Sequence, residues 1–222
     1  MKKHILCIGD SNTYGYCAEP FDCADDYDRF NEEERWTCLL AKNLGEDYLV
    51  IEEGLGGRTT VFNDPLTEGL SCLDVLFPIM MSHCPLDLLI IMLGTNDTKE
   101  RFGVTAECIG VGMERLINKA KAINAWKNNS PNILLISPPH ILDNMYTGPF
   151  YGVMGKECAE KSRELAFYYK AVAERTGCHF QDAEGIAEFN PTDGMHLTQN
   201  GHAALAAHLA NIIPTMVNKD EK

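Results

Sequence analysis

The sequence predicts an α/β fold in which five parallel strands form one sheet with helices on both faces. Short apolar runs alternate along the chain with longer amphipathic segments, and Gly, Asn or Pro residues mark the joins between them. Repeated strand–helix units place their strands parallel, because each helix returns the chain to the same edge of the sheet. Residues 88–93 are apolar throughout, which is typical of a central strand that is covered on both sides.

The predicted strands are short apolar runs flanked by turn-forming residues, and they span residues 4–8, 48–52, 86–93, 132–137 and 178–181. The predicted helices span residues 32–44, 67–82, 105–128, 154–176 and 199–217. In the last four, apolar residues recur near i, i+3, i+4 and i+7 over enough length to favour helix over strand. Residues 19–34 are acidic and follow no period, which indicates a surface excursion that flanks the site.

Length and composition fit one globular domain over residues 1–217, followed by a short charged tail at 218–222. The chain has 222 residues, of which 45% are hydrophobic and 23% are charged. Its 19 Lys and Arg against 32 Asp and Glu give a net charge of −13, which disfavours nucleic acid and anionic membranes as partners. We therefore expect a small-molecule partner.

The sequence indicates a soluble, cytoplasmic protein. Its apolar runs are far shorter than the roughly 20 residues of a transmembrane helix, and the one at the start is too short for a signal peptide. The nine cysteines are odd in number and none are paired as C-x-x-C, so neither a disulfide framework nor a zinc site is expected. His196, His202 and His208 recur every six residues and do not share a helix face, so no metal site is expected there.

Four polar or glycine-rich segments follow predicted strands, at residues 9–13, 54–60, 94–97 and 192–196. In an open parallel sheet, ligands bind in the crevice beyond the carboxyl ends of the strands. We therefore expect all four segments to line one rim.

These segments carry the groups that acyl transfer needs. Ser11 offers a hydroxyl nucleophile at a strand-to-helix turn, and His196 offers an imidazole base suited to proton transfer near neutral pH. Asp193 lies three residues earlier and would orient the imidazole. The backbone N–H groups of Ser11 and Gly57 and the side-chain amide of Asn96 would stabilise the oxyanion.

Three further residues are candidates for substrate binding: Asn12, Tyr14 and Arg58. Tyr14, like Tyr16, follows the nucleophile closely and would shape the acyl or alcohol site, with core packing as the open alternative. Arg58 could equally form a structural ion pair. The pocket walls are expected mainly from residues 16–34 and 141–155, so acyl-chain length is not legible from the sequence.

Each segment alone could be a simple turn, and Asp10 and Asp97 are expected to be turn-forming and network carboxylates. Taken in order, however, Gly9-Asp10-Ser11, the Gly-Gly-Arg-Thr-Thr glycine, Gly94-Thr95-Asn96-Asp97 and Asp193-x-x-His196 resemble the four blocks of the SGNH (GDSL-type) hydrolases. Residues 35–36, 50–55, 58–60 and 85–99 are similar to the arylesterase and acyltransferase branch. The resemblance covers roughly the first hundred residues, then 137–139 and 191–205.

This resemblance implies a flavodoxin-like three-layer α/β/α sandwich. It also implies a triad of Ser11, Asp193 and His196, an oxyanion hole of Ser11, Gly57 and Asn96, no metal or organic cofactor, and a homo-oligomer. No serine of the chain lies in the Gly-x-Ser-x-Gly elbow of the α/β-hydrolases, which disfavours that fold.

The expected function is that of a serine esterase, which hydrolyses short-acyl or aryl carboxylic esters through an acyl-Ser11 intermediate. An acyltransferase, a thioesterase or a lysophospholipase could use the same triad. From other classes, a flavin- or phosphate-binding flavodoxin-like module and a non-catalytic interaction protein stay open.

Overall fold

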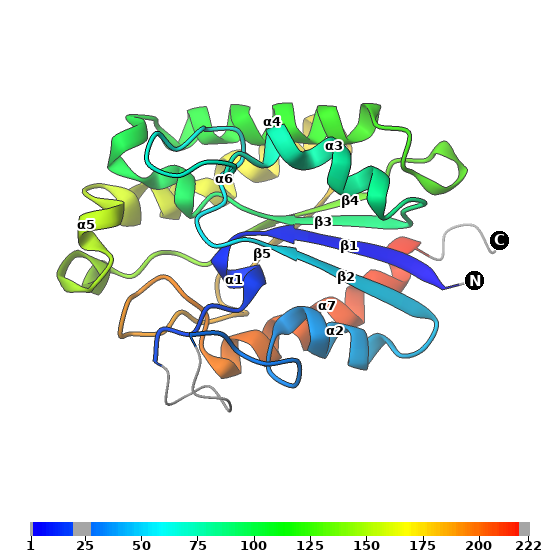
Figure 1. Cartoon of the computed structure of the whole chain (residues 1–222), viewed down its shortest axis with the longest axis horizontal. Helices are drawn as coiled ribbons and strands as arrows, with labels where there is room; N and C mark the ends of the chain where they lie inside the picture. Colours follow the sequence, from blue (N-terminus) through cyan, green and yellow to red (C-terminus); the bar gives the residue numbers. More distant parts are fainter. Residues whose placement is uncertain (1, 20–27, 218–222) are drawn as a thin grey trace.

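Five strands form one all-parallel sheet in the order β2-β1-β3-β4-β5 in the computed structural model, which describes residues 2–19 and 28–217 (Figure 1). The strands are β1 (Lys3–Gly9), β2 (Tyr48–Gly54), β3 (Leu88–Met92), β4 (Ile133–Ser137) and β5 (His179–Asp182). All five lie where the apolar runs predict them. The flavodoxin-like fold class is confirmed, because 2-1-3-4-5 is the strand order of that fold.

Helices cover both faces of the sheet (Figure 1). One layer consists of α3 (Cys72–Ser82), α4 (Ala106–Ala122) and α6 (Cys158–Thr176). The other consists of α2 (Trp36–Leu44) and α7 (Gln199–Val217). Two short helices, α1 (Ser11–Tyr14) and α5 (Tyr151–Met154), lie at the end of the sheet where the strands finish. Short 3₁₀ turns span Asn96–Thr98, Glu100–Phe102, Lys127–Asn129 and Asp143–Thr147.

The core has two large clusters, one on each face of the sheet. Leu6 and Leu89 belong to the cluster under α3, α4 and α6, whereas their neighbours Ile5 and Leu88 belong to the cluster over α2 and α7. Successive side chains of a strand point to opposite faces, so an apolar strand supplies both cores. All five residues of β3 are buried, as expected for the central strand.

The predicted helix at 105–128 ends early, at Ala122. Beyond it the chain turns to pair with the segment that leads into β3, where Leu86 N–H donates to Ala125 O at 2.8 Å and Lys127 N–H donates to Leu86 O at 2.9 Å. These backbone bonds replace another turn of helix. The predicted strand 86–93 is correspondingly shorter, at Leu88–Met92.

Three other predicted helices begin later than expected, and of these the helix predicted at 32–44 begins at Trp36. Gly155 and Glu157 have φ of 75° and 62°, and this left-handed backbone delays the helix predicted at 154–176 until Cys158. The helix predicted at 67–82 begins at Cys72, because the preceding segment pairs with the loop after β2, where Thr59 N–H donates to Leu70 O at 2.9 Å.

The sequence predicts no disulfide framework, and the structure has a disulfide bond at Cys17. Residue count and spacing carry no information about which cysteines meet in space. The other described cysteines are free, namely Cys7, Cys38, Cys72, Cys84, Cys108, Cys158 and Cys178. The tail at 218–222 and part of the predicted surface excursion, 20–27, lie outside the described residues.

No helix within residues 2–19 and 28–217 has the length and apolar character needed to span a bilayer. The cytoplasmic location, the absence of nucleic-acid and membrane partners, and the homo-oligomer stay predictions.

Candidate active site

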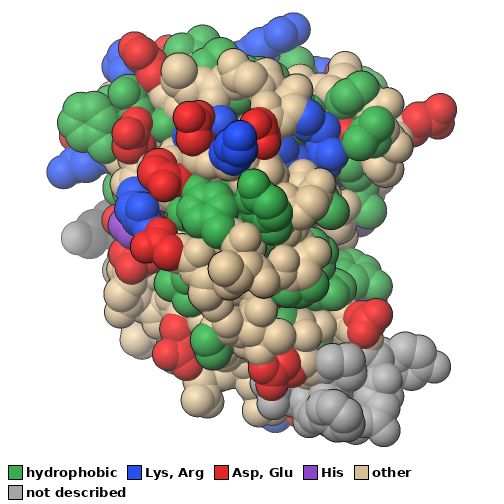
Figure 2. All heavy atoms as spheres, turned by 90° about the vertical axis from the view of Figure 1, so that its left-hand side faces the viewer, with side chains coloured by type: hydrophobic (Ala, Val, Ile, Leu, Met, Phe, Trp, Pro, Cys, Tyr) green, Lys and Arg blue, Asp and Glu red, His purple; other side chains and the backbone are tan. Residues whose placement is uncertain are grey.

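The strand order reverses beside β1, which lies between β2 and β3. Chains leaving the carboxyl ends of β1 and β3 therefore diverge to opposite faces and leave a crevice between them. Ser11 follows β1 and Asn96 follows β3, so both stand at this crevice. Figure 2 faces this edge and shows hydrophobic side chains gathered in its middle, with charged side chains around them.

Ser11 is the first residue of α1, and it is held there by local geometry. The Asp10 carboxylate caps the helix by accepting from Asn12 N–H at 2.9 Å. The end of β2 presses against the same helix, since a Cβ on Gly54 would lie only 2.1 Å from Tyr14 N. Only glycine allows this approach, which fixes Ser11 at the sheet edge.

Asp193 and His196 lie in a tight loop between β5 and α7. Within it, Asn190 N–H donates to His196 O at 2.6 Å and Gly194 N–H donates to Asn190 O at 2.8 Å. Phe189 and Leu197 form an antiparallel bridge. The loop is therefore closed by its own backbone and presents the imidazole toward α1.

The structure brings Ser11, His196 and Asp193 into one hydrogen-bonded chain. His196 Nε2 lies 2.9 Å from Ser11 Oγ, and His196 Nδ1 lies 2.6 Å from Asp193 Oδ2. A carboxylate can only accept, so it assigns the imidazole proton to Nδ1 and leaves Nε2 free to accept from the Ser11 hydroxyl. All three side chains are buried, with Ser11 6% exposed.

Asp193 is an ionised partner for the imidazole. Its other oxygen, Oδ1, accepts from the N–H groups of Met195 and His196 at 3.0 and 3.1 Å. Burial acts to raise the pKa of Asp193, but the hydrogen bonds from the His196 ring and these N–H groups lower the pKa below its ordinary value.

Two aromatic rings pack on the imidazole. The Tyr16 ring lies 4.4 Å from the His196 ring at 48°, and the Phe150 ring lies 5.3 Å away at 62°. Tyr16 and Phe150 also contact one another edge to face at 5.8 Å. These contacts restrict the orientation of the ring and shield one side of it from water.

A cavity of about 260 Å³ opens at Ser11. It is lined by Ser11, Tyr16, Gly56, Gly57, Asn96, Lys99, Phe150, Val153, Met154, Met195 and His196. The lining therefore includes Ser11 and His196 of the expected triad, together with Gly57 and Asn96 of the expected oxyanion hole. Asp193 does not line the cavity, because it lies behind His196.

The two expected donors beyond Ser11 are positioned by buried carboxylates and a glycine turn. Asn96 Nδ2 lies 3.5 Å from Asp10 Oδ2, which directs the amide toward the crevice. Asp97 accepts from Thr60 N–H at 2.9 Å and thereby joins the loop after β2 to the turn after β3. Gly57 has φ of 81°, a conformation that favours glycine.

Asp10 and Asp97 are the network carboxylates that the sequence predicts. Burial raises the pKa of each to about 6, against the lowering effect of the hydrogen bonds from Asn12 and Thr60 respectively.

The three predicted substrate-binding residues, Asn12, Tyr14 and Arg58, do not line the cavity. The Asn12 amide donates to Met195 O at 3.1 Å and accepts from Leu197 N–H at 2.9 Å, so it holds the backbone on both sides of the imidazole. The Arg29 guanidinium stacks on the Tyr14 ring, 4.1 Å from its centroid. Arg58 is buried and donates to Gly9 O at 3.1 Å and to Glu53 O, tying together the ends of β1 and β2.

Sequence reasoning missed the identity of several wall residues. Residues 141–155 were expected to contribute walls, and Phe150, Val153 and Met154 do so from α5 and its start. Lys99 is not among the residues predicted from the sequence, although it lies three residues after Asn96, about one helical turn further along the chain. That spacing is the signal that could have identified it.

His202 and His208, which follow His196 at intervals of six residues, lie in environments of their own. The buried His202 ring accepts from Trp36 N–H through Nδ1 at 3.2 Å, and His208 Nε2 lies 2.8 Å from Gln181 Oε1. In the described part of the chain, no three His, Cys, Asp or Glu side chains are grouped as metal ligands would be.

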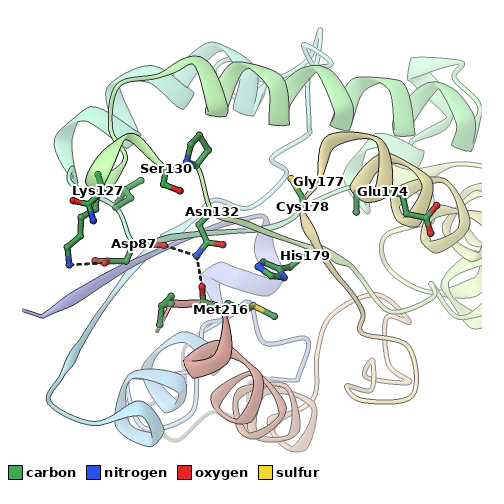
Figure 3. A pocket seen from close by; sticks show the side chains of 14 residues that line it. Asp87, Lys127, Ser130, Asn132, Glu174, Gly177, Cys178, His179 and Met216 are labelled. Atoms are coloured by element: carbon green, nitrogen blue, oxygen red, sulfur yellow. Dashed lines mark hydrogen bonds and ion pairs between the residues drawn. The ribbon is translucent and has the colours of Figure 1, made fainter. Parts of the chain in front are cut away.

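A larger hollow of about 470 Å³ lies at the opposite edge of the sheet, where β3, β4 and β5 begin (Figure 3). Its polar groups bond to one another: Lys127 pairs with Asp87 at 3.0 Å, and Asn132 donates to Asp87 O and Met216 O at 3.0 and 3.1 Å. Ser11 and His196 do not line this hollow.

A flavodoxin-like α/β/α sandwich with a Ser–His–Asp chain at the switch point of its sheet defines a serine hydrolase that is distinct from the α/β-hydrolase fold. The GDSL-like lipase/acylhydrolase family model matches residues 7–204, and the chain belongs to this family. This confirms the resemblance drawn from the four sequence blocks.

Solved structures agree with this assignment. The chain is 36% identical to the Mycobacterium smegmatis aryl esterase, with a TM-score of 0.86 over 96% of this chain and 99% of that one. It is 35% identical to a carbohydrate acetylesterase family member from Sinorhizobium meliloti, with a TM-score of 0.86 over 97% and 99% of the two chains. No curated protein sequence matches the chain.

Proposed function

We propose that this protein hydrolyses small carboxylic esters through an acyl-Ser11 intermediate. The observation that carries the proposal is the unbroken chain from Ser11 Oγ to His196 to Asp193, at 2.9 and 2.6 Å, at the mouth of an apolar cavity. Each link lies within the range expected of a nucleophile, its base and the group that orients the base.

In the first step, Ser11 Oγ attacks the ester carbonyl while its proton passes to His196 Nε2. The negatively charged Asp193 stabilises the resulting imidazolium. The imidazolium then gives its proton to the departing alcohol, and the acyl group stays on Ser11. In the second step, His196 takes a proton from water, which attacks the acyl carbon. The bond between the acyl carbon and Ser11 Oγ then breaks, Oγ takes the proton back from His196, and the acid is released.

The negative oxygen of each tetrahedral intermediate would accept from Ser11 N–H, Gly57 N–H and Asn96 Nδ2. These groups come from the ends of β1, β2 and β3, and all three residues line the same cavity. A donor of this kind contributes about 10²–10³ in rate.

The cavity favours short acyl groups. At about 260 Å³ it is smaller than the roughly 300–1,000 Å³ typical of sites for drug-sized ligands. Its apolar walls, Tyr16, Phe150, Val153, Met154 and Met195, suit an acetyl-sized acyl group or an aryl leaving group. The names of the similar structures, an aryl esterase and a carbohydrate acetylesterase, support the same substrate range.

Substitution of Ser11 by Ala tests the proposal directly. Turnover of p-nitrophenyl acetate should fall by at least about 10⁴-fold, because the nucleophile is lost. The matched control is Ser71→Ala, since the Ser71 hydroxyl is buried without a hydrogen-bond partner among the described residues. A fluorophosphonate probe should label the wild type and Ser71→Ala but not Ser11→Ala. Equal turnover by Ser11→Ala and wild type would refute the proposal.

Acyl transfer to an alcohol is the second candidate, favoured by the aromatic and aliphatic walls beside His196. It uses the same acyl-Ser11 intermediate, with an alcohol in place of water. Ester formation on adding an alcohol to p-nitrophenyl acetate and enzyme would reveal it. Thioesters, lysophospholipids and p-nitrophenyl esters of increasing chain length should be assayed as alternative substrates in the same way. A yellow protein that the probe does not label would instead favour a flavin-binding module.

A further inference from the structure

Lys99 is a buried cation in the wall of the cavity that holds Ser11. Its side chain is 5% exposed, and it lines the cavity together with Gly57 and Asn96. Lys99 N–H donates to Asn96 O at 3.3 Å, so the two residues belong to one turn. Lys99 Nζ lies 4.0 Å from the position that a Cβ on Gly57 would occupy. The ammonium group therefore lies on the side of the cavity where Gly57 and Asn96 stand.

Lys99 shares its ion-pair partner with a second cation. Asp64 Oδ2 lies 3.5 Å from Lys99 Nζ, and the same oxygen lies 3.3 Å from Arg101 Nε. Within the described residues, Asp64 is the one carboxylate at ion-pair distance from Lys99. In this ion-paired cluster one carboxylate thus faces two cations, and the buried Asp97 and Asp10 carboxylates interact with Lys99 from farther away.

Burying an ammonium group costs free energy that a single shared carboxylate offsets incompletely. Burial lowers the pKa of Lys99, and the nearby Asp64 acts against this. An apolar residue at this position would complete the wall with Val153 and Met154 without that cost. A desolvated charge beside a nucleophile is characteristic of functional sites, where the field acts on the reacting atoms.

We infer that Lys99 supplies a fixed positive charge to the oxygen that becomes negative when Ser11 attacks an ester. The inference rests on the proposed function and adds a charged residue to the neutral donors. A bond forms between Ser11 Oγ and the carbonyl carbon, the π electron pair moves onto the carbonyl oxygen, and the hydroxyl proton goes to His196 Nε2. Lys99 keeps its protons throughout. Its charge stabilises the anionic intermediate more than the neutral ester, which raises kcat.

Lys99→Met removes the charge and keeps an unbranched side chain. Its kcat for p-nitrophenyl acetate should fall by about 10–100-fold, with KM changed by less than about threefold. Lys99→Arg keeps the charge and should recover most of the loss. Arg101→Met is the matched control, because it removes the other cation on Asp64 but does not line the Ser11 cavity, so its kcat should stay near that of the wild type.

Inhibition by phenylboronic acid separates charge stabilisation from simple packing. This acid forms an anionic tetrahedral adduct on a serine hydroxyl, so its inhibition constant should rise in Lys99→Met by the factor by which kcat/KM falls. If Lys99→Met does not fold, as judged by its melting curve, Lys99→Gln serves in the same comparison.

Wild-type kcat and boronate inhibition in folded Lys99→Met would overturn the inference, as would a Lys99→Arg variant that is as slow as Lys99→Met. Neither result touches the proposed function, which fails only if Ser11→Ala remains active.

Discussion

Asn12 lies next to the nucleophile, but its side chain holds the histidine loop in place. Its amide donates to Met195 O at 3.1 Å and accepts from Leu197 N–H at 2.9 Å, one bond on each side of His196. Asn12→Ala breaks both bonds at once. If Asn12 positions His196, the variant should lose kcat on every ester alike, whereas a substrate contact would raise KM for particular esters.

The structure sets the size of the effect. Met195 and Leu197 are 3% and 1% exposed, so the backbone groups released by the substitution cannot easily turn to water. Each unsatisfied buried group costs about 1–3 kcal/mol, which gives roughly 2–6 kcal/mol of lost stability for the pair. For a chain of this length that corresponds to a fall in Tm of roughly 4–24 °C. A displacement of His196 by about 1 Å would cost about 10²-fold in kcat.

Asn132→Ala is the matched control, because the Asn132 amide likewise makes two hydrogen bonds to the backbone, here both as donor and at the opposite edge of the sheet (Figure 3). Both variants should melt earlier in a thermal scan, and only Asn12→Ala should lose kcat for p-nitrophenyl acetate and phenyl acetate. The reasoning is refuted if Asn12→Ala keeps wild-type kcat, or if its KM rises for one ester and not for the other.

Two further predictions follow from buried ionisable groups. Asp193→Asn should lower kcat by about 10³–10⁴-fold with little change in KM, because an amide no longer fixes the imidazole tautomer or stabilises its charge, and steady-state kinetics would measure this. Burial lowers the pKa of His202 to about 3, so its contribution to stability is complete above pH 6.5 and is lost as the pH falls toward 3. Asp10 and Asp97, with pKa raised to about 6, act in the opposite direction, but their effect cancels in a comparison of wild type with His202→Asn. Between pH 7 and pH 4, urea unfolding should show the stability difference moving in the variant's favour by about 3 kcal/mol, and a constant difference would contradict this.

Much of the fold could be predicted, because the information is local. Apolar periodicity located all five strands and the helices between them, and the buried run at Leu88–Met92 identified the central strand. Two of the misjudged helix ends have a common cause. At Ala122 and Cys72 the helix competes with backbone pairing to a segment distant in sequence, and such pairing leaves no mark on local periodicity.

The sequence alone determined which groups meet at Ser11, since the carboxyl ends of parallel strands must share one edge and the four blocks follow those ends. Only the tertiary structure decided the direction of each side chain. It turned Asn12 and Arg58 toward protein partners, set Tyr16 and Phe150 on the imidazole, and placed the Lys99 ammonium in the cavity wall. The physical reason is that strand order depends on chain connectivity and hydrophobic burial, which a pattern encodes. A side chain's direction depends instead on backbone angles and on neighbours that come from remote parts of the chain.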